Sequence, residues 1–169
     1  MILYRVFSWN GSSRRGEAGG PLYVPRSRQG SGRHDNPELY GAVYCALEPV
    51  GCIAEALQPF RNQAVGPGDL ERHPGMALAL VELELSADVR LCNLDEPGEL
   101  QRRSLRPSRI ATLDRRLTQE LAARLFHEGL GGCLWWSVLE SLWINATLFA
   151  ERVSGALAIR SGPRRLALA

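Results

Sequence analysis

Apolar positions along the chain follow two different periods, which together predict an α+β domain. Residues 2–7 and 41–47 are short apolar runs rich in β-branched and aromatic side chains, and residues 76–85 end in alternating apolar and acidic side chains. These patterns are typical of strands. A further short strand is expected over residues 133–137 and a last one over residues 153–159. The pattern therefore predicts a mixed β-sheet.

Two other segments carry apolar residues at helical spacing. The first, residues 50–61, follows Pro49, which suits the first turn of a helix. Its apolar stripe leaves Glu55 on the opposite side, and the stripe consists of Val50, Ile53, Ala54, Leu57 and Phe60. In the second segment leucine recurs every fourth residue, at Leu113, Leu117, Leu121 and Leu125. Gly129 is placed to end this second helix. Two helices are thus expected to flank the sheet.

The connections between these elements are long. Residues 8–37 are rich in Gly, Ser, Arg and Pro, and a loop of this length in a compact domain is usually functional or disordered. Residues 95–109 carry two prolines and four arginines and are expected to form a surface loop. One domain is therefore expected over residues 1–160, followed by a short tail over residues 161–169.

Composition narrows the classes of function. The chain has 169 residues, of which 45% are hydrophobic and 22% charged, as in a globular protein of one domain. The 20 basic residues are all arginine and face 18 acidic ones, so the formal charge is only +2. This balance argues against a protein whose main role is to bind nucleic acid. Because lysine is absent, Schiff-base and P-loop lysine chemistry are excluded.

Cysteine and histidine spacing predicts no metal site. The four cysteines stand at positions 45, 52, 92 and 133 without a CxxC pair, and no histidine has a partner at ligand spacing. The first residues lack the pattern of a signal peptide, and no run of 18 apolar residues occurs. We therefore expect a cytoplasmic protein without membrane contact, whose thiols stay reduced and mostly pack as small apolar side chains.

Three segments place polar side chains where a core would not require them. Arg5 stands inside the first expected strand, where its guanidinium faces an anion if buried, or water if the strand is an edge. Arg33 follows glycines 30 and 32 in a loop that could approach an anionic ligand or be a flexible surface segment. Taken singly, Tyr44 suits a core and Glu55 a solvated helix face, and Trp135 with its neighbours suits packing.

Taken in order, these segments resemble the RES-domain family, which is named for a recurring arginine, glutamate and serine. Arg5 falls in a Tyr-Arg element, and Arg33 in a Gly-Arg element followed by Asn-Pro. Tyr44 lies in an apolar-Tyr-small strand pattern and Glu55 in an Ala-Glu element on the next helix. Ser137 follows a glycine pair and precedes Leu-Phe at 148 and 149. The resemblance extends over most of the chain.

The resemblance implies an ADP-ribosyltransferase-like fold and a toxin of a bacterial toxin–antitoxin pair that consumes NAD+. NAD+ would lie in a cleft where Glu55 stabilises the cationic ribose as nicotinamide leaves, without a metal. Arg5 and Arg33 would bind the pyrophosphate, Tyr44 would stack on nicotinamide, and Ser137 would donate to its amide or to the ribose. The partner would be a helix-turn-helix, Xre-like antitoxin, and the protein could form a homodimer.

The acceptor of the ADP-ribosyl group stays open. Water would make the protein an NAD+ glycohydrolase, inorganic phosphate a phosphorylase, and a protein side chain an ADP-ribosyltransferase. The arginines at 102, 103, 106 and 109 could receive phosphate, contact an acidic partner or be solvated. A different class of function is a non-enzymatic, arginine-rich module that binds RNA or an acidic protein, which the small net charge disfavours.

Overall fold

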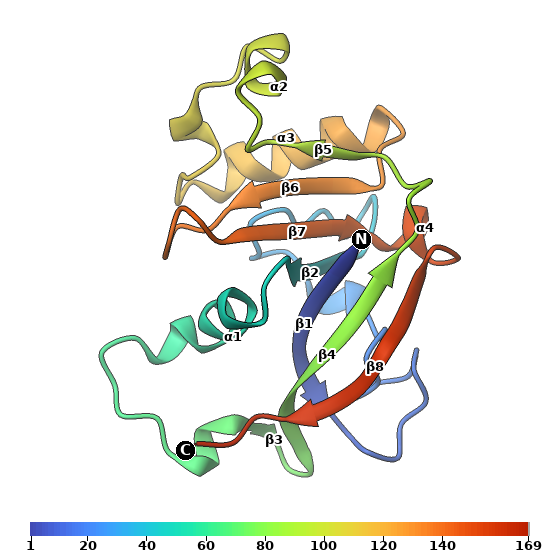
Figure 1. Ribbon diagram of the computed structural model, residues 1–169, viewed down its shortest axis with the longest axis vertical. Helices are drawn as coiled ribbons and strands as arrows, with labels where there is room; N and C mark the ends of the chain where they lie inside the picture. Colours follow the sequence, from blue (N-terminus) through green and yellow to red (C-terminus); the bar gives the residue numbers. More distant parts are fainter. Residues whose placement is uncertain (169) are drawn as a thin grey trace.

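The computed structural model describes residues 1–168, which form a mixed sheet of eight strands with helices beside it (Figure 1). Along the sheet the order is β3-β4-β1-β2-β7-β6-β5, and β8 pairs with β4 as well. Only β5 and β6 are parallel neighbours among the described residues. The α+β class predicted from the sequence is confirmed. The strands are β1 (Ile2–Trp9), β2 (Ala42–Ala46), β3 (Glu71–His73), β4 (Met76–Leu85), β5 (Leu91–Asn93), β6 (Gly132–Trp136), β7 (Ile144–Phe149) and β8 (Leu157–Arg165).

The sheet divides into two halves at the junction of β1 and β2. β1 pairs with β4 along its whole length, whereas it meets β2 only at Tyr4 opposite Ala46. As a result β1, β4 and β8 run in a different direction from β2, β7 and β6 (Figure 1). Helix α1 (Pro49–Leu57) contacts β1, β2 and β7, so it lies where the two halves diverge. This divergence gives side chains from both halves access to the same region.

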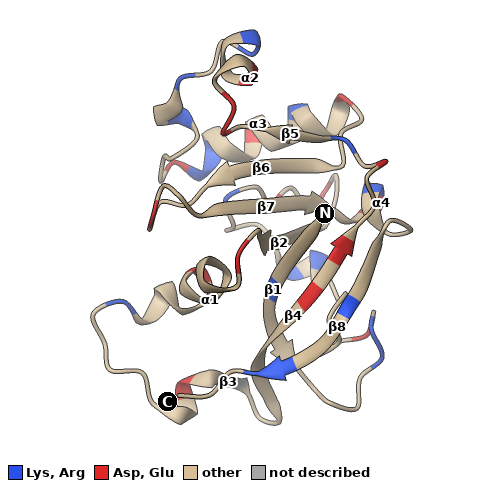
Figure 2. Cartoon of the chain, in the orientation of Figure 1, with Lys and Arg blue, Asp and Glu red and all other residues tan. Residues whose placement is uncertain are grey.

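Charged positions of both signs are interspersed over the elements (Figure 2). Acidic positions on β4 lie beside arginines on β8, for example, and Arg160 Nε is 3.1 Å from Glu82 Oε1. Such cross-strand pairs make modest contributions at a solvent-exposed edge. Among residues 1–168, no helix has the length and apolar character needed to cross a membrane.

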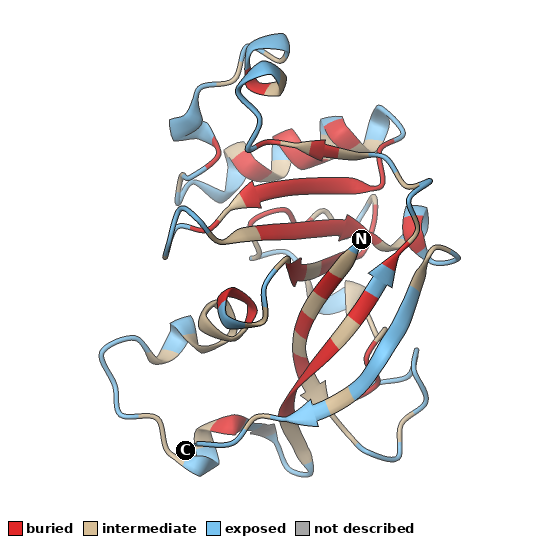
Figure 3. Ribbon diagram, in the orientation of Figure 1, coloured by how far each residue is buried: buried red, intermediate tan, exposed pale blue. Residues whose placement is uncertain are grey.

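The core lies on both faces of the sheet, and the inner strands are its most buried part (Figure 3). Helix α3 (Arg115–His127) packs on β6 through buried residues that include Leu121 and Leu125. Its ends follow from local chemistry: Asp114 accepts hydrogen bonds from backbone N–H groups of the first turn, and Gly129 adopts a φ of 79° just after the helix. The four cysteines are buried and unpaired, as expected of small core side chains.

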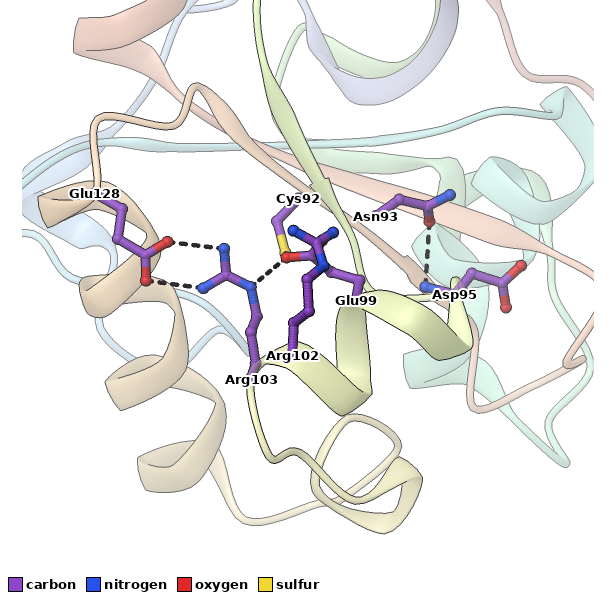
Figure 4. A network of polar contacts seen from close by, with 7 residues as sticks. All are labelled: Cys92, Asn93, Asp95, Glu99, Arg102, Arg103 and Glu128. Atoms are coloured by element: carbon purple, nitrogen blue, oxygen red, sulfur yellow. Dashed lines mark hydrogen bonds and ion pairs between the residues drawn. The ribbon is translucent and has the colours of Figure 1, made fainter.

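A polar cluster anchors the segment before α3 (Figure 4). This segment contains helix α2 (Pro97–Arg102), directly followed by Arg103, whose guanidinium donates to both oxygens of Glu128 at 2.8 and 2.7 Å and also to Glu99. These hydrogen bonds raise the pKa of Arg103 and lower those of Glu128 and Glu99. Arg103 therefore connects α2 to the end of α3. Its guanidinium donors already bind carboxylates, so few of them are available to a phosphate ion.

Several elements differ from the predicted ones. Residues 95–109 were expected to be loop, but the structure places α2 and a 3-10 turn there. β7 was not predicted, because its alternation of small and polar residues with apolar ones is weak over six positions. The expected last strand over 153–159 is wrong in position, since helix α4 (Ala150–Val153) precedes β8. β8 runs on to Arg165, so residues 161–165 belong to the sheet rather than to a tail.

The first predicted helix is correct in place but not in every contact. α1 ends at Leu57 and continues as a 3-10 turn over Gln58–Phe60. Val50, expected in the buried stripe, is 60% exposed because it lies at the start of the helix, outside the region that packs on the sheet.

Candidate active site

A hollow of about 300 Å³ lies between α1, the inner strands and the loop that follows β1. It combines an apolar floor with a few polar side chains, which is the usual make-up of a small-molecule site. Four of the predicted site residues line it or reach into it through a hydrogen bond, and they come from four separate segments of the chain. These four are Arg33, Tyr44, Glu55 and Ser137.

The carboxylate of Glu55 is held through one of its two oxygens. Its Oε1 accepts a hydrogen bond from Ser137 Oγ at 2.6 Å and another from Asn145 Nδ2 at 2.8 Å. Ser137 Oγ in turn accepts the backbone N–H of Leu139 at 2.9 Å. Among the described residues, no hydrogen bond ends on Glu55 Oε2. The site therefore offers a fixed carboxylate with one oxygen available to a ligand.

Arg33 forms a second wall of the hollow. Its Nη1 donates to the carbonyl oxygens of Ile110 at 2.9 Å and Thr112 at 2.7 Å, and its guanidinium lies 4.8 Å from the centre of the Trp135 ring. Burial is the main cause that lowers the pKa of Arg33, and the nearby charge of Arg115 lowers it further. Backbone carbonyls and an aromatic face thus orient a cation that has no ion pair within residues 1–168.

The loop that carries Arg33 is folded around Asp35. Asp35 Oδ1 accepts the hydroxyl of Tyr44 at 2.7 Å, and Oδ2 accepts the backbone N–H groups of Gly30 and Gly32 at 2.8 and 2.7 Å. Burial raises the pKa of Tyr44, and the charge of Asp35 adds to this effect. A Cβ atom at Gly32 would lie 2.6 Å from both Asp35 oxygens and from the Tyr44 hydroxyl, so any other residue here would displace these side chains. Tyr44 therefore uses its hydroxyl to hold the loop, while its ring lines the hollow.

A buried histidine supports the site from behind. His34 is 1% exposed, and its Nδ1 is 2.8 Å from Thr147 Oγ1, which also accepts the indole N–H of Trp135 at 3.1 Å. The Thr147 hydroxyl accepts the indole N–H and can still donate its own hydrogen. It can therefore donate to Nδ1 of a neutral His34 ring. Burial, with the charges of Arg33 and Arg115, lowers the pKa of His34 to about 3. His34 is therefore a neutral, structural side chain that holds Trp135 in place.

Arg5 lies outside this hollow, in contrast to the single cleft that we expected. Its guanidinium donates to the carbonyl oxygens of Pro21 at 2.9 Å and Tyr23 at 2.7 Å, and burial lowers its pKa. It lines a second hollow of about 800 Å³, which shares Val6 and Ala56 with the first. The two hollows therefore adjoin, with Glu55 in one and Arg5 in the other.

Comparison with protein families decides the identity of the domain. The family model of the RES domain matches residues 2–168. The chain belongs to the RES domain family. This confirms the resemblance drawn from the order of Arg5, Arg33, Tyr44, Glu55 and Ser137 in the sequence.

Solved structures show the same fold. This RES domain is similar to a chain in the crystal structure of the M. tuberculosis MbcT–MbcA toxin–antitoxin complex, with a TM-score of 0.69 and 18% identity. The alignment covers 98% of this chain and 84% of that chain. No curated protein matches the sequence.

Other residues at the RES domain site were not predicted from the sequence. Asn145 and Asp35 both make hydrogen bonds that shape the hollow, and Trp135 had been interpreted as a packing residue. An amide within the apolar run of β7 was the available signal for Asn145. Asp35 bonds two glycines of its own loop, so the nearby glycines were a local signal, whereas its contact with Tyr44 on β2 was not visible in the sequence. Within residues 1–168, no group of three or more His, Cys, Asp and Glu side chains could hold a metal ion.

Proposed function

We propose that this RES domain is the toxin of a toxin–antitoxin pair and that it cleaves the bond between nicotinamide and ribose in NAD+. The observation that carries the proposal is the Glu55 carboxylate, fixed by Ser137 and Asn145 in a hollow that also contains Arg33. The fold shared with a chain of the MbcT–MbcA toxin–antitoxin complex supports the biological role.

The chemistry needs a negative charge close to the ribose. Nicotinamide leaves from a quaternary nitrogen, so its departure leaves positive charge on the sugar and requires little proton transfer. A carboxylate that is already oriented stabilises this charge without reorganisation. Glu55 Oε2 accepts no hydrogen bond from residues 1–168, so it is free to face the ribose. Ser137 Oγ donates to Glu55 Oε1, which supports a role for Ser137 through the carboxylate beside the expected donation to nicotinamide or ribose.

The two adjoining hollows suit the two halves of a dinucleotide. We assign the nicotinamide and its ribose to the smaller hollow, where Tyr44 and Trp135 offer aromatic surface. The pyrophosphate would extend toward the larger hollow, where Arg5 carries a buried positive charge and forms no ion pair with the described residues. Arg33 would bind the same pyrophosphate from the other side. Remote contacts of this kind orient the reacting bond.

The proposal has three versions, which differ in the molecule that accepts the ADP-ribosyl group. Water would give hydrolysis and inorganic phosphate would give phosphorolysis, and both deplete NAD+. Transfer to a protein target remains the alternative enzymatic function. The antitoxin that neutralises the protein would be of the helix-turn-helix type. A non-enzymatic binding role is less supported, because acidic and basic positions are mixed (Figure 2) and Arg103 is engaged by carboxylates.

Incubation of the purified protein with NAD+ tests the proposal. Chromatography should show free nicotinamide, and added phosphate should change the second product if phosphorolysis occurs. Glu55→Gln keeps the size of the side chain and should lower turnover at least ~100-fold, because it removes the charge that stabilises the transition state. Glu48→Gln is the matched control, since Glu48 lies exposed at the start of the same helix. Intact NAD+ in the presence of folded, antitoxin-free protein would refute the proposal.

A further inference from the structure

Asn145 is a buried polar side chain on an inner strand of the sheet. It lies on β7, opposite Ala46 on β2 and Trp135 on β6, and it is only 3% exposed. The next residues of β7 on the other face, Ala146 and Leu148, belong to the core. An amide in such a place costs free energy unless it is hydrogen-bonded. The hydrogen-bond partner of the Asn145 amide therefore explains why this side chain can be buried in the sheet.

The partner of this amide is the Glu55 carboxylate. A carboxylate can only accept hydrogen bonds, so the NH2 group of Asn145 must face Glu55 Oε1, at 2.8 Å. Ser137 donates to the same oxygen, but Ser137 lies beyond the end of β6, next to a turn. The backbone of Asn145 is paired on both sides within the sheet. Asn145 therefore presents its donor from a backbone that the sheet pairs on both sides, whereas the Ser137 backbone is held outside the sheet, by its N–H to Trp143 O at 2.7 Å.

We propose that Asn145 is a positioning residue for the cleavage of NAD+: it holds Glu55 Oε1 so that Oε2 faces the ribose. This inference rests on the proposed function. Two donors on one oxygen restrict the rotation of the carboxylate. Stabilisation of a developing charge depends steeply on position, and a displacement of about 1 Å can lower a rate about 100-fold. Asn145 acts through Glu55, so its loss should reduce kcat more than it changes KM.

Asn145→Leu removes the donor and keeps a similar side-chain volume. We expect kcat for NAD+ to fall about 100-fold while the KM stays close to that of the unaltered protein. The matched control is Asn93→Leu, another asparagine on a strand of the same sheet. Asn93 Oδ1 accepts the backbone N–H of Asp95 at 3.2 Å (Figure 4). Asn93 is not among the residues that line the hollow. This control should keep its kcat.

Asn145→Asp gives a readout that a purely structural role would not produce. At neutral pH the introduced carboxylate repels Glu55, so turnover should be low. When the pH falls and the two neighbouring carboxyl groups share a proton, a hydrogen bond between them can form again. Turnover relative to the unaltered protein should therefore rise as the pH falls. If Asn145→Leu does not fold, the pH dependence of Asn145→Asp still tests whether Asn145 positions Glu55.

Three results would overturn the inference. An unchanged kcat in Asn145→Leu would show that Glu55 does not need this donor. A raised KM with an unchanged kcat would place the amide on the substrate instead. A pH dependence of Asn145→Asp that parallels the unaltered protein would show that no hydrogen bond is restored. Failure of the unaltered protein itself to consume NAD+ is a separate result, which refutes the proposed function and this inference with it.

Discussion

Acidification should destabilise the fold through His34. The pKa of His34 is lowered to about 3 in the folded protein, from its ordinary value of 6.5, mainly because the ring is fully buried. Between these two values the unfolded chain binds a proton at His34 that the folded protein does not bind. The stabilisation associated with neutral His34 is therefore fully present above about pH 6.5, and it is lost progressively as the pH falls toward 3.

The size of this effect follows from the same two values. Each pH unit within the window corresponds to about 1.4 kcal/mol. Because the unfolded histidine is already partly protonated near its ordinary pKa, the free energy of unfolding should fall by about 2 kcal/mol between about pH 7 and about pH 5. The carboxylates with lowered pKa values, Glu99 and Glu128, titrate mainly below this range and add little to it.

Urea unfolding followed by tryptophan fluorescence can measure this difference. His34→Gln keeps a neutral hydrogen-bonding side chain and retains the other two histidines, so it is a suitable comparison. The unaltered protein should lose about 2 kcal/mol between the two pH values, and the variant only a small part of that. An equal loss in both proteins would refute the assignment of the pH dependence to His34.

Three further predictions concern the site and its supports. Gly32→Ala should disorder the loop that carries Arg33, because the new Cβ would lie 2.6 Å from both carboxylate oxygens of Asp35. NAD+ turnover and the melting temperature should both fall. An unchanged turnover would contradict this prediction. Arg103→Gln should lower the free energy of unfolding by about 1 kcal/mol, with a smaller loss at high salt, as measured by urea denaturation. Burial raises the pKa values of Cys45 and Cys52 to about 12, so both thiols should resist iodoacetamide at neutral pH until urea unfolds the protein, as mass spectrometry can show.

The local elements of this protein could be predicted from its sequence. Strand and helix periods depend on neighbours in the chain, so β1, β2 and α3 were found close to their observed bounds. The order of the five family residues was sufficient to identify a RES domain, which the family model confirms. Glu55 was also correctly placed on the helix after β2.

The contacts between these elements were decided by the tertiary structure. Glu55, Ser137 and Asn145 meet only because the register of β6 and β7 brings one end of those strands beside α1, across 82 and 90 residues of sequence. Arg5 and Arg33 lie in separate hollows because different backbone carbonyls hold them, those of residues 21 and 23 for Arg5 and those of residues 110 and 112 for Arg33. Residue order along the chain specifies which groups are present, whereas the pairing of distant strands determines which of them can touch.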